Sequence, residues 1–214
     1  MAEYREYRVQ AADQRPLLQF MLDALKDVGC AILYEPPANV APFRITFETP
    51  AGERLGIISY AFRANSRRAD TRLEDEYQIR MKYGSERANG GGRLHELWQD
   101  PCGLYTTLLV GIDVGRGVFI GAEPVLHNPT KLFTSITFKR ERADRVIAAG
   151  WHNWEHEHRL QHDDTDGIES EWFEVLVGGT KESFLRYVRF ERDALGEAQG
   201  HRQLLAERAD GVAP

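Results

Sequence analysis

Polar and hydrophobic residues alternate from Glu76 to Tyr83 within the stretch LEDEYQIRMKYGS, residues 73–85. Side chains of an extended strand point to opposite faces with a period of two, so this stretch predicts a half-buried strand. Its apolar face carries Tyr77, Ile79, Met81 and Tyr83. Its polar face carries Glu76, Gln78, Arg80 and Lys82. This polar face is a solvated surface, a nucleic-acid contact or part of a catalytic strand, and the rest of the chain bears on that choice.

The same alternation predicts further strands, most of them joined by short turns. They cover residues 43–49, 54–62, 104–112, 117–124, 133–139 and 171–179. Turns at residues 50–52 and 113–116 each join two successive strands, which predicts two antiparallel hairpins. The strand of residues 73–85 is expected to be the third strand in the sheet of the first hairpin.

Apolar residues at helical spacing predict helices at residues 13–28, 140–149 and 180–195. In the first helix Asp13 is a candidate N-cap and Gly29 a stop signal. Hairpins combined with helices predict an α+β fold, with a mixed, mainly antiparallel sheet and helices packed on it. We expect residues 1–195 to form a single α+β domain, and residues 196–214 to form a C-terminal helix and tail that can lead into a further domain.

The formal net charge of -6 argues against a protein that coats nucleic acid indiscriminately, but it leaves room for a local basic face. No apolar run approaches the roughly 18 residues of a membrane span, and the first residues lack the apolar core of a signal peptide. We therefore predict a cytoplasmic protein with no membrane partner. In that compartment Cys30 and Cys102 are expected to be free thiols.

Arginines cluster just before the alternating strand. Between positions 63 and 72 the arginines face a single acid, Asp70. Guanidinium groups suit phosphate oxygens and the acceptor edge of guanine, and the neighbouring Asn65 suits adenine. A charge run of this kind is often only a solvated loop. The alternative is a DNA contact made by Arg67, Arg68, Arg72, Gln78, Arg80 and Lys82.

The segment Glu76-Tyr77-Gln78 fits a second kind of chemistry. Restriction-type nucleases place an acid on one strand and Glu-x-Lys, or less often Glu-x-Gln, on the next, so that carboxylates hold a divalent cation. The partner acid would come from Asp70, Asp75 or Glu48, and no spacing enforces the pairing. In this alternative Glu76, Gln78 and Asp75 are catalytic and Mg²⁺ is required; otherwise we expect no cofactor. A salt-bridged sheet face is the more common explanation.

Histidines gather in the segment WHNWEHEHRLQH, residues 151–162. On a helix, His152 and His156 would lie on one side, which is one arrangement for binding a metal. The segment lacks the His-Glu-x-x-His pattern of zinc proteases, and such clusters are more often surface features. We assign no metal ligand from the sequence.

Aromatic residues are numerous enough to build either a stacking pocket for a base or an ordinary core. The candidates are Trp98, Tyr105, Phe119, Phe133, Trp151, Trp154 and Trp172. The sequence does not distinguish between the two.

Several of these segments together resemble a known family. They are RLEDEYQIRMKYG from Arg72, LLVGID, GVFIGAEPVLHNPTKLFTSITF, the pair Gly150-Trp151, and EVLVGGTKESFLRYVRFERDALG. The chain is similar, from about residue 40 to 195, to the methylase-associated domains found at the front of bacterial restriction-modification proteins. In that family the strand commonly reads Asp-Glu-x-Arg-Ile-Gln, whereas this chain has Gln78 and Arg80 exchanged.

The resemblance implies a DNA-recognition module of a bacterial restriction or phage-defence system, with duplex DNA as partner. The positions carried over are Arg72, Asp75, Glu76, Gln78 and Arg80 on the strand, and His127, Thr130 and Lys131 in a later loop. Two alternatives stay open: the metal-dependent endonuclease, and an interaction subunit that docks a methyltransferase or a nuclease.

Overall fold

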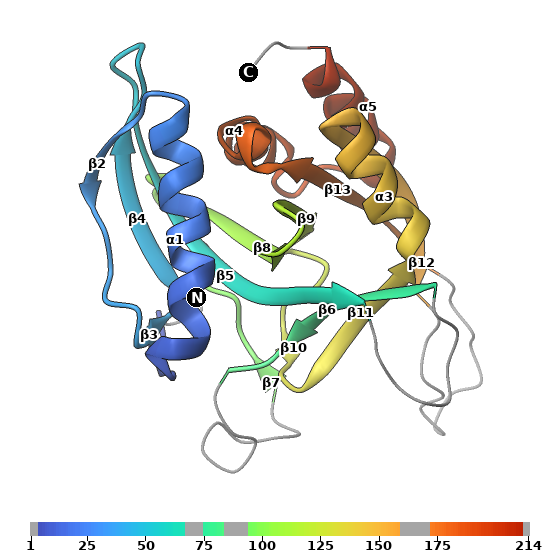
Figure 1. Cartoon of the computed structure of the whole chain (residues 1–214), viewed down its shortest axis with the longest axis horizontal. Helices are drawn as coiled ribbons and strands as arrows, with labels where there is room; N and C mark the ends of the chain where they lie inside the picture. Colours follow the sequence, from blue (N-terminus) through green and yellow to red (C-terminus); the bar gives the residue numbers. More distant parts are fainter. Residues whose placement is uncertain (1–3, 67–74, 84–93, 159–171, 212–214) are drawn as a thin grey trace.

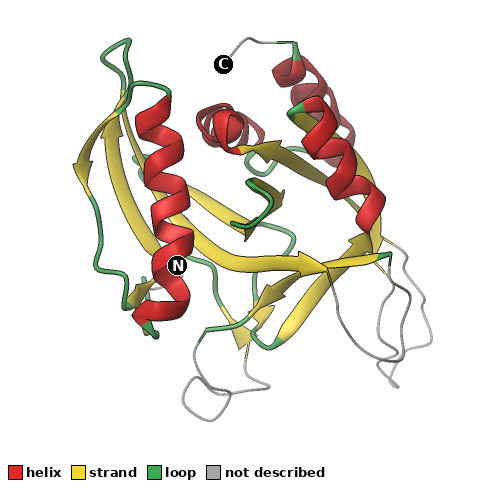
Figure 2. Cartoon of the chain, viewed as in Figure 1, coloured by secondary structure: helices red, strands yellow, loops and turns green. Residues whose placement is uncertain are grey.

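The computed structural model describes residues 4–66, 75–83, 94–158 and 172–211, and the statements below concern these residues. Within them the chain forms a nine-stranded sheet with helices packed on it (Figures 1 and 2). The main path of the sheet runs β11 (Thr134–Lys139), β6 (Glu76–Met81), β5 (Arg54–Ser66), β8 (Tyr105–Asp113), β9 (Val118–Ala122), β13 (Trp172–Thr180) and β12 (Trp151–His158). Two further strands extend it from β5, namely β4 (Phe43–Glu48) and β2 (Ala31–Tyr34).

Two short ladders lie outside this sheet. They pair β1 (Tyr7–Arg8) with β3 (Val40–Ala41), and β7 (Leu94–His95) with β10 (Thr130–Lys131). The helices are α1 (Ala11–Asp27), α3 (Arg140–Ala149), the short 3₁₀ helix η1 (Lys181–Ser183), α4 (Phe184–Ala194) and α5 (Gln199–Asp210). None of the described helices is long and apolar enough to cross a membrane.

Within the described sheet, neighbouring strands are antiparallel except β5 and β8, which are parallel. The predicted hairpins are β4–β5 and β8–β9, and β6 pairs with β5 as expected. The prediction of an α+β fold with a mixed, mainly antiparallel sheet is therefore confirmed.

Each face of the sheet carries its own apolar core. Along β5, Ile57 and Ala61 pack under α1, α4 and α5, whereas Ile58, Tyr60 and Phe62 point into the core on the other face. On this second side the ring of Phe138 on β11 lies 5.4 Å from that of Trp154 on β12. Because β11 and β12 end the main path, the sheet curls until its two ends meet. Helix α3, which joins these strands, contacts both (Figure 1).

The helical arrangement considered for His152 and His156 does not form, because residues 151–158 are strand β12, paired along its whole length with β13. Asp13 is not an N-cap, because α1 begins earlier, at Ala11, after an extended Gln10. The stop signal is correct: Gly29 has a φ of 82°, which favours glycine, and its N–H donates to the Lys26 carbonyl.

Helix α5 packs on the far end of the sheet. The indole N–H of Trp151 on β12 donates to the carbonyl of Ala206 at 3.0 Å. Arg202 of α5 makes a bidentate ion pair with Glu191 of α4, and both side chains are fully buried. Residues 199–210 thus share a core with the preceding elements, and the further domain that residues 196–214 are expected to lead into stays a prediction.

Candidate functional site

The alternation in β6 is confirmed by burial. Tyr77, Ile79, Met81 and Tyr83 are all 3% exposed or less. Their polar neighbours face the opposite side, where β5 and β11 continue the same surface. We call this surface the polar face; it comprises Arg63 and Asn65 of β5, Glu76, Gln78 and Arg80 of β6, Lys82, and Ser135, Thr137 and Lys139 of β11. It lies on the side of the sheet covered elsewhere by α1, α4 and α5.

Positive charge concentrates where the polar face meets the start of α1. Arg63 and Arg80 are direct cross-strand partners, and both are exposed. Together with Lys82 they line a groove of about 400 Å³ whose other wall is formed by Val9, Gln10, Asp13 and Gln14. Asp13 is the one carboxylate among these described lining residues, so the groove carries a net positive charge.

Asp13 neutralises little of that charge. Its Oδ1 lies 3.5 Å from Nη2 of Arg63, and the two side chains are 63% and 56% exposed. Exposed ion pairs at such a distance contribute about 0–1 kcal/mol. The guanidinium of Arg63 therefore stays available to a ligand.

The other predicted DNA-contact residues are dispersed. Arg67, Arg68 and Arg72 lie outside the described residues. Gln78 is on the polar face but only 7% exposed, between Asn65 and Thr137. Thr130 is buried in β10 and Lys131 is exposed beside it, while His127 belongs to another cluster.

The two described strands that flank β6 supply no acid to the nuclease alternative. Glu76 lies opposite Lys139 of β11, and neither described strand flanking β6 contains an aspartate or glutamate. Glu48 is ion-paired with Arg54 at 2.8 Å, at the other end of β5, about 40 Å along the strand from the Glu76 end. Asp75 is exposed and lies directly before Glu76, and Asp70 falls outside the described residues.

Aromatic residues mostly build the core. Phe119, Trp151 and Trp154 are 5% exposed or less, so they are not available to stack on a base. Trp98 is partly exposed and makes an edge contact with Tyr4, their ring centroids 5.5 Å apart. The side chain of Trp172 lies outside the described residues.

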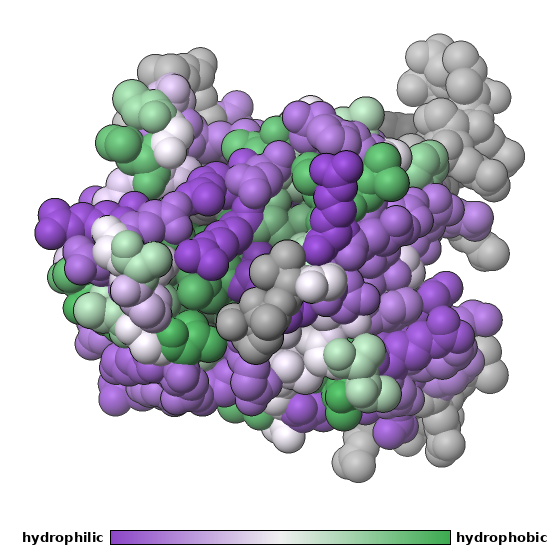
Figure 3. Space-filling view, turned by 90° about the horizontal axis from the view of Figure 1, so that it is seen from above, coloured by the Kyte–Doolittle hydropathy of each residue, from purple (hydrophilic) through white to green (hydrophobic). Residues whose placement is uncertain are grey.

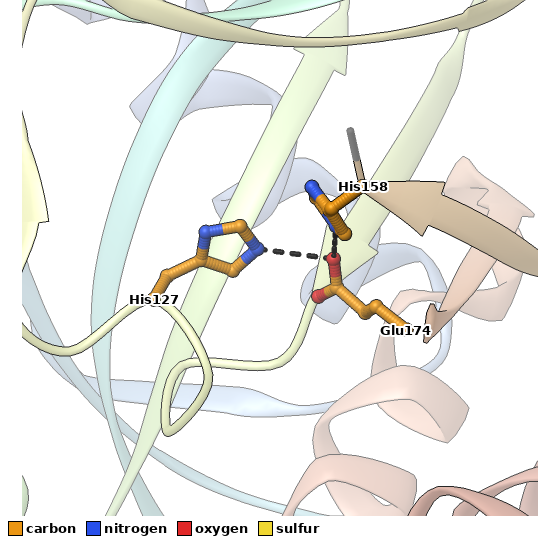
Figure 4. A group of neighbouring side chains, drawn as sticks. All are labelled: His127, His158 and Glu174. Atoms are coloured by element: carbon orange, nitrogen blue, oxygen red, sulfur yellow. Dashed lines mark hydrogen bonds and ion pairs between the residues drawn. The ribbon is translucent and has the colours of Figure 1, made fainter. Parts of the chain in front are cut away.

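A histidine–glutamate cluster lies on the other side of the sheet from the polar face, next in alternation along β13 to Leu176 of the second core. Figure 4 shows its three side chains. Its members come from three places: His127 from the loop after β9, His158 from the end of β12, and Glu174 from β13. The Nε2 atoms of His127 and His158 lie 3.0 Å and 2.7 Å from the same Glu174 oxygen, Oε2. Glu174 is fully buried, and the two histidine side chains are 10% and 17% exposed.

The surroundings fix the orientation of the Glu174 carboxylate. Its second oxygen, Oε1, accepts a hydrogen bond of 2.6 Å from the backbone N–H of Glu123. The side chain of Glu123 accepts from Nε2 of Gln199, whose Oε1 in turn accepts from the N–H of Val175. This network leaves Oε2 of Glu174 directed at the two imidazoles.

Burial and charge act in opposite directions on the cluster. Burial alone would raise the pKa of Glu174, but His127, the hydrogen bonds from His127 and His158, and the Glu123 N–H outweigh it and lower the pKa to about 2. On the same face of β12, burial and the neighbouring His158 lower the pKa of His156 to about 4. Glu174 is therefore ionised and His156 neutral at pH 7.

This cluster was not predicted from the sequence. A metal pair of His152 and His156 is not formed either, because His152 stacks on Trp154. His156 does lie beside His158, with ring centroids 4.6 Å apart. The sequence signal was period-two spacing of His152, Trp154, His156 and His158, which places all four on one face of a strand.

The fold and these two groups of residues define an α+β domain with a basic sheet face and a buried histidine–glutamate cluster. The chain belongs to the Methylase-associated X1 family, whose model matches residues 55–188. The resemblance found in the sequence is thereby confirmed. Membership points to a role related to restriction-modification and to association with a methyltransferase. No curated protein and no solved structure matches the chain.

Proposed function

We propose that this chain is a DNA-recognition module of a bacterial restriction or phage-defence system, and that the polar face contacts duplex DNA. The observation that carries the proposal is the direct pairing of Arg63 with Arg80, with Lys82 in the same groove. Family membership supplies the restriction-modification context.

The arginine pair favours an anionic ligand. Like charges placed directly opposite across a sheet destabilise it, so these side chains carry an unfavourable interaction when no anion is bound. A phosphate between two guanidinium groups would relieve this repulsion and accept charge-assisted, bidentate hydrogen bonds. Asn65 is exposed on the same face, and its amide offers the donor and acceptor that an adenine edge requires.

Fluorescence anisotropy with a labelled duplex tests the proposal. The double variant Arg63→Gln, Arg80→Gln is expected to bind at least about tenfold more weakly than the wild type at low salt, a difference of about 1.4 kcal/mol. Arg54→Gln is the matched control, because Arg54 is an exposed, ion-paired arginine at the other end of β5. A wild-type protein with no measurable affinity for methylated or unmethylated duplexes would overturn the proposal.

A second candidate is docking of a methyltransferase at an apolar groove. The groove measures about 350 Å³ and lies where the end of α1 meets α4 and α5, lined by Val28, Leu185, Phe190, Leu205 and Ala209 among charged residues. Figure 3 shows apolar surface recessed between hydrophilic side chains in the view from above. Apolar hollows with a polar rim are typical of protein-binding sites.

Co-expression and co-purification with a candidate DNA methyltransferase test the docking candidate. The variants Leu185→Glu and Leu205→Glu are expected to abolish a complex that Leu204→Glu retains. Leu204 is 54% exposed on the same helix as Leu205 and does not line the groove. Equal retention of the complex by all variants would eliminate this surface.

A further inference from the structure

We propose that His127, His158 and Glu174 bind a divalent transition-metal ion, for which zinc is the best match. The described part of the chain holds these three ligand atoms within 4.8 Å of one another. The site is distinct from the polar face and does not depend on DNA binding.

The donor set selects the class of ion. Two imidazole nitrogens and one carboxylate oxygen suit zinc and its neighbours, whereas Mg²⁺ and Ca²⁺ prefer oxygen ligands. Three protein ligands leave a fourth position of a tetrahedral ion open to water or to a substrate. The cluster thus has the composition of a reactive zinc site more than of a closed structural one.

Two of the three separations between ligand atoms are close to those around a bound ion, and the third does not exceed 4.8 Å. Ligand atoms around a tetrahedral zinc, each about 2.0–2.1 Å from the metal, lie about 3.3 Å apart. The observed nitrogen–oxygen separations of 2.7 Å and 3.0 Å are a little shorter. Small rotations of the side chains would therefore admit the ion between both imidazoles and the carboxylate.

Charge and outer contacts support the same assignment. Glu174 has no exposed surface, and a buried carboxylate requires a positive partner. The backbone N–H of Glu123 holds one carboxylate oxygen, which leaves the other directed at the histidines. Outer hydrogen bonds of this kind orient the ligands of metal sites.

Zinc titration by isothermal calorimetry tests the proposal on chelator-treated protein that carries no polyhistidine tag. The wild type is expected to bind one equivalent of zinc. His127→Gln, His158→Gln and Glu174→Gln should each weaken binding by more than about 100-fold, because even outer-contact substitutions cost about 10–100-fold. Bound cobalt should show the visible absorption of a tetrahedral site in the wild type and lose it in the variants.

Two histidine variants serve as matched controls. His201→Gln removes an exposed histidine paired with Glu197, and His152→Gln removes one from β12 outside the cluster. Both should bind zinc as the wild type does. If Glu174→Gln fails to fold, the loop variant His127→Gln still decides the question. A wild type that binds no zinc, or cluster variants that bind as well as the controls, would reduce the cluster to a glutamate–imidazole hydrogen-bond network and overturn the proposal.

Discussion

Arg202 and Glu191 form a buried ion pair that joins α5 to α4. Both side chains are 0% exposed, and two hydrogen bonds of 2.6 Å and 3.0 Å connect them. Removing one partner leaves the other as an uncompensated buried charge, so we expect Arg202→Met to lower the free energy of unfolding by about 3–5 kcal/mol. Urea unfolding followed by circular dichroism measures this.

The exposed pair Arg145–Glu141 provides the comparison. Arg145→Met should change the free energy of unfolding by no more than about 0.5 kcal/mol. Combining Glu191→Leu with Arg202→Met should recover most of the lost stability, since paired replacement of a buried ion pair is often nearly neutral. A double variant as unstable as Arg202→Met would contradict the explanation.

At the level of single residues, the sequence predicted the polar face better than the histidine–glutamate cluster. The β6 residues of the polar face follow from alternation within residues 73–85, which is a local property, whereas their pairing with Arg63 is a tertiary contact. The cluster joins positions 127, 158 and 174, and His158 meets Glu174 only through the register of β12 against β13. No local pattern contains that register, so the histidine–glutamate cluster could not be predicted from spacing.

Helix α4 approaches the sheet so closely that a glycine is required beneath it. A Cβ atom at Gly121 of β9 would lie 2.2 Å from the Tyr187 hydroxyl oxygen and 2.3 Å from its ring. We expect Gly121→Ala to destabilise the protein by about 1–3 kcal/mol, because it overpacks a buried contact. The thermal unfolding midpoint reports the loss.

Gly200 of α5 is the control for this change, because a Cβ there meets nothing within 4 Å. Gly200→Ala should stabilise the protein by about 0.4–1 kcal/mol through the reduced entropy of the unfolded chain. Destabilisation of similar size in both variants would show that the contact with Tyr187 is not the cause.

Most elements could be predicted because each is periodic on its own. The helix at Arg140–Ala149 has the predicted bounds, and the hairpins β4–β5 and β8–β9 follow from short turns. Strand β12 could not be predicted in this way. Its sequence WHNWEHEH, residues 151–158, is polar on both faces and fits helical spacing as well as strand alternation. Its pairing with β13 decides the conformation, and that pairing is a tertiary contact.

The whole molecule separates its two candidate sites onto opposite faces of one curled sheet. The polar face continues the side covered by α1, α4 and α5, whereas Glu174 lies on the side of the second core, next in alternation to Leu176. Substitutions in one site are therefore expected to leave the other intact. Zinc affinity should be unchanged in the Arg63→Gln, Arg80→Gln variant.

The salt dependence of DNA binding tests the central claim most directly. Each phosphate contact contributes about 0.9 to the slope of log affinity against log salt concentration, so loss of the one phosphate that Arg63 and Arg80 would share should make the slope shallower by about 0.9. Anisotropy titrations across a series of salt concentrations give this slope for the wild type, the double variant and Arg54→Gln. If Arg63 and Arg80 contact phosphate, the slope is shallower in the double variant alone. Equal slopes in all three proteins would contradict this contact.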